Sequence, residues 1–161
     1  MKAVVQRARS ASVTVEGQIT GRISRGLLVY FGVAGGDSEK DAAWMAEKIA
    51  NLRIFEDTQG KMNLSIKDIL AKEKDIPSQA GEGDGPIGIL AISQFTLLAD
   101  ASKGRRPYYG DAANPEKAKA LYECFMEKIR EQGLICEAGI FQAHMDVSYT
   151  NDGPVTIILN S

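Results

Sequence analysis

The chain has 161 residues, of which 44% are hydrophobic and 25% charged, and these values are typical of one globular domain. A domain of this size buries about two-thirds of its unfolded surface, so it does not need disulfides or a bound metal to be stable. The formal net charge of −2 excludes a protein that binds polyanions through a strong overall positive field. Any contact with nucleic acid would therefore be local.

The cysteines and the apolar segments of the sequence indicate in which cellular compartment the protein resides. The N-terminus lacks the apolar core of a signal peptide, and no apolar run is long enough to cross a membrane. Cys124 and Cys136 are the two cysteines, and they do not form a C-x-x-C pair. We expect both to be free buried thiols, with a disulfide between them as the less favoured alternative. These features predict a cytoplasmic protein that does not associate with membranes.

Short alternating or continuously apolar segments predict strands along much of the chain. In chain order the expected strands are residues 4–15, 19–23, 27–33, 53–55, 62–64, 87–92, 134–136, 143–149 and 155–159. The turn at Glu16-Gly17-Gln18 should join the first two strands as a hairpin. Residues 32–36 are rich in glycine but lack the sequence patterns of phosphate loops, so we interpret them as a flexible turn.

Two amphipathic helices are expected. Ser38 can cap the first, and its apolar residues at helical spacing are Ala42, Met45, Ile49 and Leu52. Asn114 at the N-cap and Pro115 at the first helical position begin the second. Its apolar face contains Ala118, Leu121, Tyr122, Phe125 and Ile129.

These elements predict an α+β fold in a single domain over residues 1–161. The expected architecture is a mainly antiparallel curved sheet, or partial β-barrel, with the two amphipathic helices outside. Residues 66–70 should form a short helical turn, and residues 72–86 a polar surface insertion.

The strand over residues 87–92 is continuously apolar and suits burial on both faces. Ser93-Gln94-Phe95-Thr96 follows it directly, so the strand end delivers polar groups that could border a cavity. The alternative is a core strand that runs into a capped turn. Asn151-Asp152-Gly153-Pro154 stands before the last strand, and its composition favours a β-turn.

The residue inventory excludes several kinds of catalysis. His144 is the single histidine, and we expect a structural role for it within a strand. A Ser-His-Asp triad would need this histidine, and zinc sites built on several histidines are excluded. We therefore expect no metal site. An enzyme with this inventory would work with backbone N–H groups, hydroxyls and amides, or with a group of its substrate.

The segments Ser93-Gln94-Phe95-Thr96-Leu97 and Asn151-Asp152-Gly153-Pro154-Val155-Thr156 together resemble the D-aminoacyl-tRNA deacylase family, also called D-tyrosyl-tRNA deacylases. The resemblance covers almost the whole chain and departs from the family at residues 72–86. Further segments with the family's order and spacing are residues 6–7, 11–15, 53–55, 60–64 and 106–107.

The resemblance implies the family's fold and a cofactor-free homodimeric esterase that removes D-amino acids from the 3′ end of tRNA. Ser93, Gln94, Phe95 and Thr96 would line the catalytic pocket. Gly153 and Pro154 would form a Gly-cis-Pro motif that enters the partner's pocket and rejects L-amino acids, while D-aminoacyl-tRNA and glycyl-tRNA are accepted. The resemblance implies that Arg7 helps to hold this motif and that Met62 and Phe141 line the pocket region. Asn151 would be a further supporting or substrate-binding residue.

Two questions stay open at this point. Thr96 could act as the nucleophile, or the 2′-OH of the substrate ribose could assist, and the second view is favoured because no base is apparent beside Thr96. The competing function is a non-catalytic RNA-binding barrel. Its binding residues would be Lys103, Arg105, Arg106, Tyr108 and Tyr109. A purely structural dimer is a third alternative.

Overall fold

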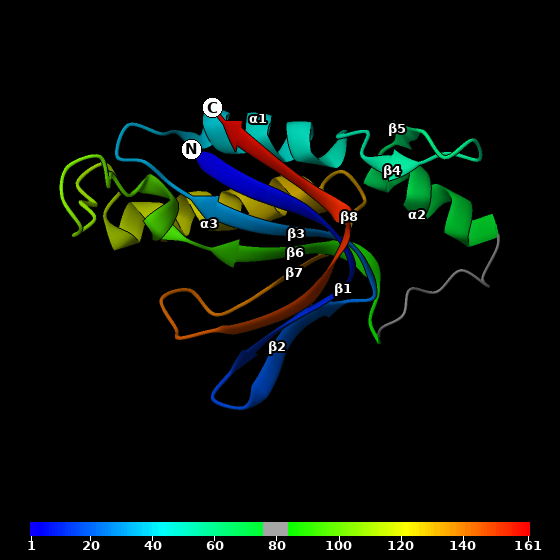
Figure 1. Cartoon of the computed structure of the whole chain (residues 1–161), viewed down its shortest axis with the longest axis horizontal. Coiled ribbons are helices and arrows are strands. Elements are labelled where there is room, and N and C mark those ends of the chain that lie inside the picture. Colours follow the sequence, from blue (N-terminus) through cyan, green and yellow to red (C-terminus); the bar gives the residue numbers. More distant parts are fainter. Residues whose placement is uncertain (76–83) are drawn as a thin grey trace.

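The computed structural model describes residues 1–75 and 84–161, and Figure 1 shows a strongly curved sheet with helices along one face. The six-stranded main sheet has the order β2-β1-β3-β6-β7, and β8 pairs with β1 off this path. The strand bounds are β1 Lys2–Val15, β2 Gln18–Ile23, β3 Arg25–Gly32, β6 Ile87–Ser93, β7 Cys136–Ala138 and β8 Asp146–Asn160.

The long strand β1 bends the sheet toward a barrel. Its first half pairs with β3 and its second half with β2, while β8 pairs with it along most of its length. All these pairings are antiparallel, and β1 and β2 form the expected hairpin. The expectation of an α+β fold with a mainly antiparallel curved sheet is therefore confirmed.

The centre of the sheet differs from the expectation in strand direction. β6 pairs in parallel with both β3 and β7, and its residues from Ile87 to Ile92 are all buried. Parallel neighbours require crossover connections, which here contain helices α1 (Glu39–Ala50) and α3 (Pro115–Arg130). The buried strand at 87–92 is confirmed, and its polar successor residues lie where it leaves the core.

The two expected helices cover one face of the sheet (Figure 1). Ser38 and Asp41 form a capping box at α1, and the side chain of Asn114 accepts a hydrogen bond of 2.9 Å from the backbone N–H of Lys117 at α3. Between α3 and the sheet, the rings of Phe31 and Phe125 stack with centroids 4.3 Å apart. This packing fixes α3 against β3, beside the end of β6.

A third helix stands where a short turn was expected. Residues 66–70 begin α2 (Ile66–Asp75), so the predicted insertion at 72–86 starts inside a helix and otherwise falls partly outside the described residues. The carboxylate of Asp68 accepts hydrogen bonds of 2.8 and 2.7 Å from the backbone and hydroxyl of Ser65, and these bonds lower its pKa. This cap stabilises a first turn that also buries Ile66 and Ile69. Strands β4 (Phe55–Glu56) and β5 (Met62–Leu64) form a small separate sheet before it.

The expectation of a β-turn at residues 151–154 is wrong. They lie within β8, where Thr156 pairs with Gln6 and Asn151 with Ala8. Between these two pairs, β8 advances by five residues and β1 by only two. The three extra residues of β8 form a large bulge opposite Arg7. The bulge allows Pro154 to stand inside a strand, because its missing N–H is not needed for the ladder.

The remaining expectations concern cysteines and membranes. Cys124 and Cys136 are both free, but only Cys136 is buried, and burial raises the pKa of its thiol to about 12. Cys124 is half-buried, because it lies at the edge of the apolar face of α3. Among the described residues, no helix is long and apolar enough to cross a membrane.

Candidate active site

The end of β6 opens into a cavity of about 620 Å³. Ser93 is the last residue of β6 and is paired with Phe31 of β3, and the N–H of Gln94 donates a 2.8 Å hydrogen bond to the Phe31 carbonyl. The 3-10 helix η1 (Phe95–Leu98) follows at once. Ser93, Gln94 and Phe95 all line the cavity, so three of the four residues predicted from the sequence at this strand end border one pocket.

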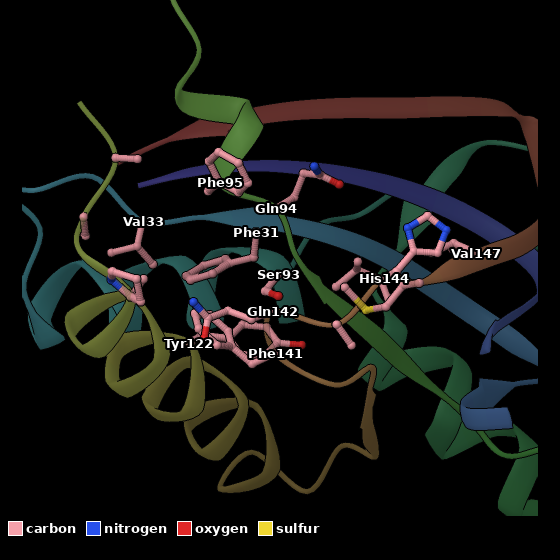
Figure 2. Close-up of a pocket in the computed structure, with 17 residues that line it drawn as sticks. Phe31, Val33, Ser93, Gln94, Phe95, Tyr122, Phe141, Gln142, His144 and Val147 are labelled. Carbon is pink, nitrogen blue, oxygen red and sulfur yellow. The ribbon is translucent and has the colours of Figure 1, made fainter. Parts of the chain in front are cut away.

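The walls of this pocket are largely apolar. Figure 2 shows Phe31, Ser93, Tyr122 and Phe141 gathered around its centre, with Phe95 above them. The α3 side chains Ala118 and Tyr122 form one wall. Phe141, which the resemblance singled out, is therefore in the pocket lining. A few polar groups on an apolar cavity are the usual composition of a small-ligand site.

Tyr122 is held as a neutral hydroxyl. Its O–H donates a 2.7 Å hydrogen bond to the carbonyl of Ala91, and burial raises its pKa above the ordinary value. The hydroxyl thus ties α3 to β6 directly under the pocket. It cannot accept a proton at neutral pH, so its contribution is to shape the site rather than to act as a base.

Thr96 lies just beyond the lining residues. The side-chain amide of Gln94 donates a hydrogen bond to the Thr96 hydroxyl oxygen. An amide N–H has no lone pair with which to take a proton. The contact therefore orients Thr96 without activating it as a nucleophile.

His144 is placed differently from the sequence expectation. It lies outside the strands, at the edge of the pocket, with its side chain 96% exposed and 3.9 Å from a carboxylate oxygen of Asp146. The expectation of a structural histidine within a strand is wrong, because β8 begins only at Asp146. Gln142 beside it also lines the pocket, and its sequence context carried no signal for this position.

A second group of predicted residues surrounds the bulge of β8. The Gly153–Pro154 peptide bond is cis, and both residues are exposed. Arg7, only 5% exposed, donates from Nε to the carbonyl of Asp152 at 3.2 Å and from Nη1 to the carbonyl of Ile54 at 2.7 Å. Its Nε also lies 3.0 Å from the Asp152 carboxylate. A buried guanidinium thus braces the exposed loop from inside.

Asn151 braces the same bulge from its own strand. Its side-chain oxygen accepts a 3.2 Å hydrogen bond from the N–H of Val155, and its amide donates to the Thr156 hydroxyl at 3.3 Å. These bonds replace ladder bonds that the bulge removes. The exposed tip at Gly153 is consequently a rigid projection rather than a loose turn.

The two groups lie apart within one protomer. On β3, Phe31 pairs with Ser93 at the pocket, and Leu27 pairs with Arg7 at the bulge. Phe31 and Leu27 are four residues apart along the strand, which corresponds to a distance of about 13 Å. Met62, 59% exposed, lies on β5 opposite Glu56, whose carboxylate is 3.6 Å from Arg7. Met62 therefore belongs to the bulge side and is not in the pocket lining. Among the described residues, no group of three His, Cys, Asp or Glu side chains could hold a metal ion.

Comparison with known proteins assigns the family. The sequence model of the family described as "D-Tyr-tRNA(Tyr) deacylase" matches residues 4–160. The chain belongs to this family. Proteins named D-aminoacyl-tRNA deacylase from Koribacter versatilis (strain Ellin345) and Thermotoga petrophila (strain ATCC BAA-488 / DSM 13995 / JCM 10881 / RKU-1) are 53% and 52% identical to it. Each match covers 100% of this chain and 97% of the relative.

Solved structures share the fold of this chain. One described as "c-Myc DNA Unwinding Element Binding Protein" is 40% identical, with a TM-score of 0.83 and coverage of 100% of this chain and 99% of that one. One described as "Structural Analysis of a probable eukaryotic D-amino acid tRNA deacylase" is 14% identical, with a TM-score of 0.73 and coverage of 98% and 97%, and it supports the fold. The resemblance seen in the sequence is confirmed. Membership in a deacylase family also confirms a hydrolase and disfavours the two non-catalytic alternatives.

Proposed function

We propose that this deacylase hydrolyses the ester bond between a D-amino acid and the 3′-terminal ribose of tRNA in the pocket at the end of β6. The observation that carries the proposal is the meeting of Ser93, Gln94 and Phe95 at the edge of a 620 Å³ apolar cavity. The cavity has room for a terminal nucleoside and its amino acid. Because tRNA is charged in the cytoplasm, we place the protein there.

The chemistry is a water attack assisted by the substrate. Water adds to the ester carbonyl, the tetrahedral intermediate collapses, and the 3′ oxygen leaves with the proton that water gave up. The N–H groups of Phe95 and Thr96 precede the first hydrogen bond of η1. Within the described part of the chain they have no hydrogen-bond acceptor, so they can stabilise the oxyanion. The neighbouring 2′-OH of the ribose relays the proton, since Thr96 has an amide donor beside it rather than a base.

Chiral selection is assigned to Gly153 and Pro154 of the partner protomer in a homodimer. Three features support this assignment: the motif is exposed, it is held rigidly by Arg7 and Asn151, and it lies away from the pocket of its own chain. Gly153 has no Cβ, so its backbone can approach the substrate's Cα closely. A hydrogen atom fits on that side of Cα, whereas an L side chain would collide.

The test is hydrolysis of matched substrates by the pure protein. D-alanyl-tRNA and glycyl-tRNA should both release their amino acid, because each presents hydrogen on the guarded side. L-alanyl-tRNA should be spared. Equal rates for D-alanyl-tRNA and L-alanyl-tRNA would contradict the proposed selection.

A further inference from the structure

A closed loop stands beside the pocket between η1 and α3. Asp100 and Tyr108 exchange two backbone hydrogen bonds of 2.8 Å, which join the two ends of the loop. The Asp100 carboxylate accepts a 2.8 Å bond from the N–H of Ser102, and this bond lowers its pKa. Gly104 adopts a φ of 76° within the loop, a conformation that suits glycine. The loop is therefore a defined structure that can present side chains in fixed positions.

Two tyrosines at the end of this loop form an aromatic surface outside the pocket. The ring of Tyr109 meets the ring of Phe95 edge-on, with centroids 5.2 Å apart, and Phe95 lines the pocket. Tyr108 is 67% exposed, and its ring lies so close to Gly110 that a side chain at Gly110 would overlap it. Aromatic surface thus continues from the pocket edge onto the loop, where one ring stands largely in solvent.

Three cations precede these rings in the chain. Lys103, Arg105 and Arg106 are all exposed, and within the described part of the chain they form no ion pair or side-chain hydrogen bond. Arg106 and the two tyrosines also line a separate open hollow. Since the whole chain has a net charge of −2, this is a local concentration of positive charge rather than part of a basic protein.

We propose that this surface, formed by Lys103, Arg105, Arg106, Tyr108 and Tyr109 and called the cationic loop below, binds the unpaired nucleotides that precede the terminal nucleotide of tRNA. The inference rests on the proposed function, which places the terminal nucleotide in the adjoining pocket. Exposed aromatic rings beside cations are the combination that binds single-stranded nucleic acid, because bases stack on the rings and phosphates pair with the cations. Three cations are too few to follow a long duplex, so the contact is confined to about three phosphates or fewer.

The experiment compares two D-alanyl substrates that differ only in these nucleotides. D-alanyl-tRNA contains them, whereas the 3′-O-D-alanyl ester of adenosine does not. Tyr108→Ala should lower kcat/KM for D-alanyl-tRNA by about 5- to 150-fold, the range expected for one stacked base. It should leave kcat/KM for the adenosine ester unchanged. Tyr108→Phe keeps the ring and should restore the tRNA value.

Variants that remove a positive charge test the proposal independently, through the salt dependence of tRNA binding. Arg105→Ala and Arg106→Ala should each flatten the dependence of the tRNA dissociation constant on salt, by about 0.7 in the log–log slope for each phosphate that the variant no longer binds. Lys48→Ala is the matched control, because it removes an exposed cation from α1, and it should change neither the slope nor the kinetics.

Two kinetic results would overturn the inference. One is an equal loss of kcat/KM on both substrates, which would mean that the cationic loop only supports the pocket. The other is no loss on either substrate. If the wild-type protein hydrolyses neither D-alanyl substrate, the proposed function fails, and binding of uncharged RNA ending in CCA then decides the inference. Equal affinity of wild type and Tyr108→Ala for that RNA would overturn it, and weaker binding by the variant would support it.

Discussion

Thr96 is a candidate nucleophile whose hydroxyl has an amide donor beside it rather than a base. Because its hydroxyl accepts a hydrogen bond from Gln94, we expect Thr96→Ala to lower kcat by about tenfold or less, the effect of losing one positioning bond. Single-turnover hydrolysis of D-alanyl-tRNA measures this value. A loss of about 10⁴-fold in a folded variant would instead identify Thr96 as the nucleophile.

The substrate provides the matching control. Replacing the terminal 2′-OH of the tRNA by hydrogen should slow the wild-type enzyme by about 10²-fold or more, since it removes a proton relay. Unchanged hydrolysis of the 2′-deoxy substrate would show that the protein supplies this relay itself.

Gly153 contributes to the bulge through the absence of a Cβ atom. Its φ is +122°, and a Cβ there would lie 2.9 Å from Val155 Cγ2 and 3.1 Å from Arg7 Nη2. Gly153→Ala should therefore displace the guanidinium that braces the bulge. We expect kcat/KM for D-alanyl-tRNA to fall at least about tenfold, with a loss of stability of about 1–3 kcal/mol.

Gly17→Ala separates backbone strain from displacement. Gly17 also has a positive φ, +77°, but a Cβ there would contact nothing within 4 Å. This variant should lose stability in thermal unfolding and keep its kinetics. If Gly153→Ala behaves in the same way, the bulge does not contribute to the reaction.

At the scale of elements, Tyr122 joins α3 to β6 beneath the pocket. Tyr122→Phe removes the 2.7 Å bond to Ala91 and should cost about 0.5–1.5 kcal/mol of unfolding free energy. Burial raises the folded-state pKa of Tyr122 above the unfolded value near 10, so its contribution is complete below pH 10. Above that pH the unfolded chain ionises first, and stability falls as the pH rises.

The pH dependence makes this a specific test. Urea unfolding between pH 8 and 11 should show a steeper loss of stability for wild type than for Tyr122→Phe. Parallel curves would mean that other groups, such as Tyr30 or Cys136, account for the alkaline dependence.

The elements that the sequence predicts well have strong local signals. Helices α1 and α3 have capping residues and one apolar face, and β6 is apolar over its whole length. Helix α2 had a signal too, because Ser65 and Asp68 have the spacing of a capping box, but its polar second half resembled a loop. The parallel direction of β3, β6 and β7 could not be read locally, since periodicity does not encode which strands pair.

In the candidate site, too, only residues with a local sequence signal could be predicted. Ser93 and Gln94 were found because polarity changes abruptly where β6 ends. Phe31 and Tyr122 were interpreted only as core residues, since their place in the pocket depends on pairing and packing between distant segments. Gly153 and Pro154 were recognised through the family resemblance, because their composition alone is that of a turn, and the bulge exists only through pairing with β1.

For the whole molecule, the separation of the pocket from the bulge predicts that one protomer lacks a complete site. Phe95 beside the pocket and Ile158 on β8 are exposed apolar side chains, and a dimer would cover such surface. We expect a homodimer in light scattering at assay concentration. A fully active monomer would contradict the cross-subunit arrangement.

Mixing two inactive variants tests that arrangement directly. Ala118→Trp should fill the pocket, and Gly153→Leu should disrupt the bulge, so each homodimer loses both sites. If the motif acts across the interface, a heterodimer has one site with two intact halves and one site with two damaged halves. Half of the dimers in a fully exchanged mixture are heterodimers, so about a quarter of wild-type activity should return. If Gly153 served its own pocket, every site would contain one damaged part, and mixing would restore nothing.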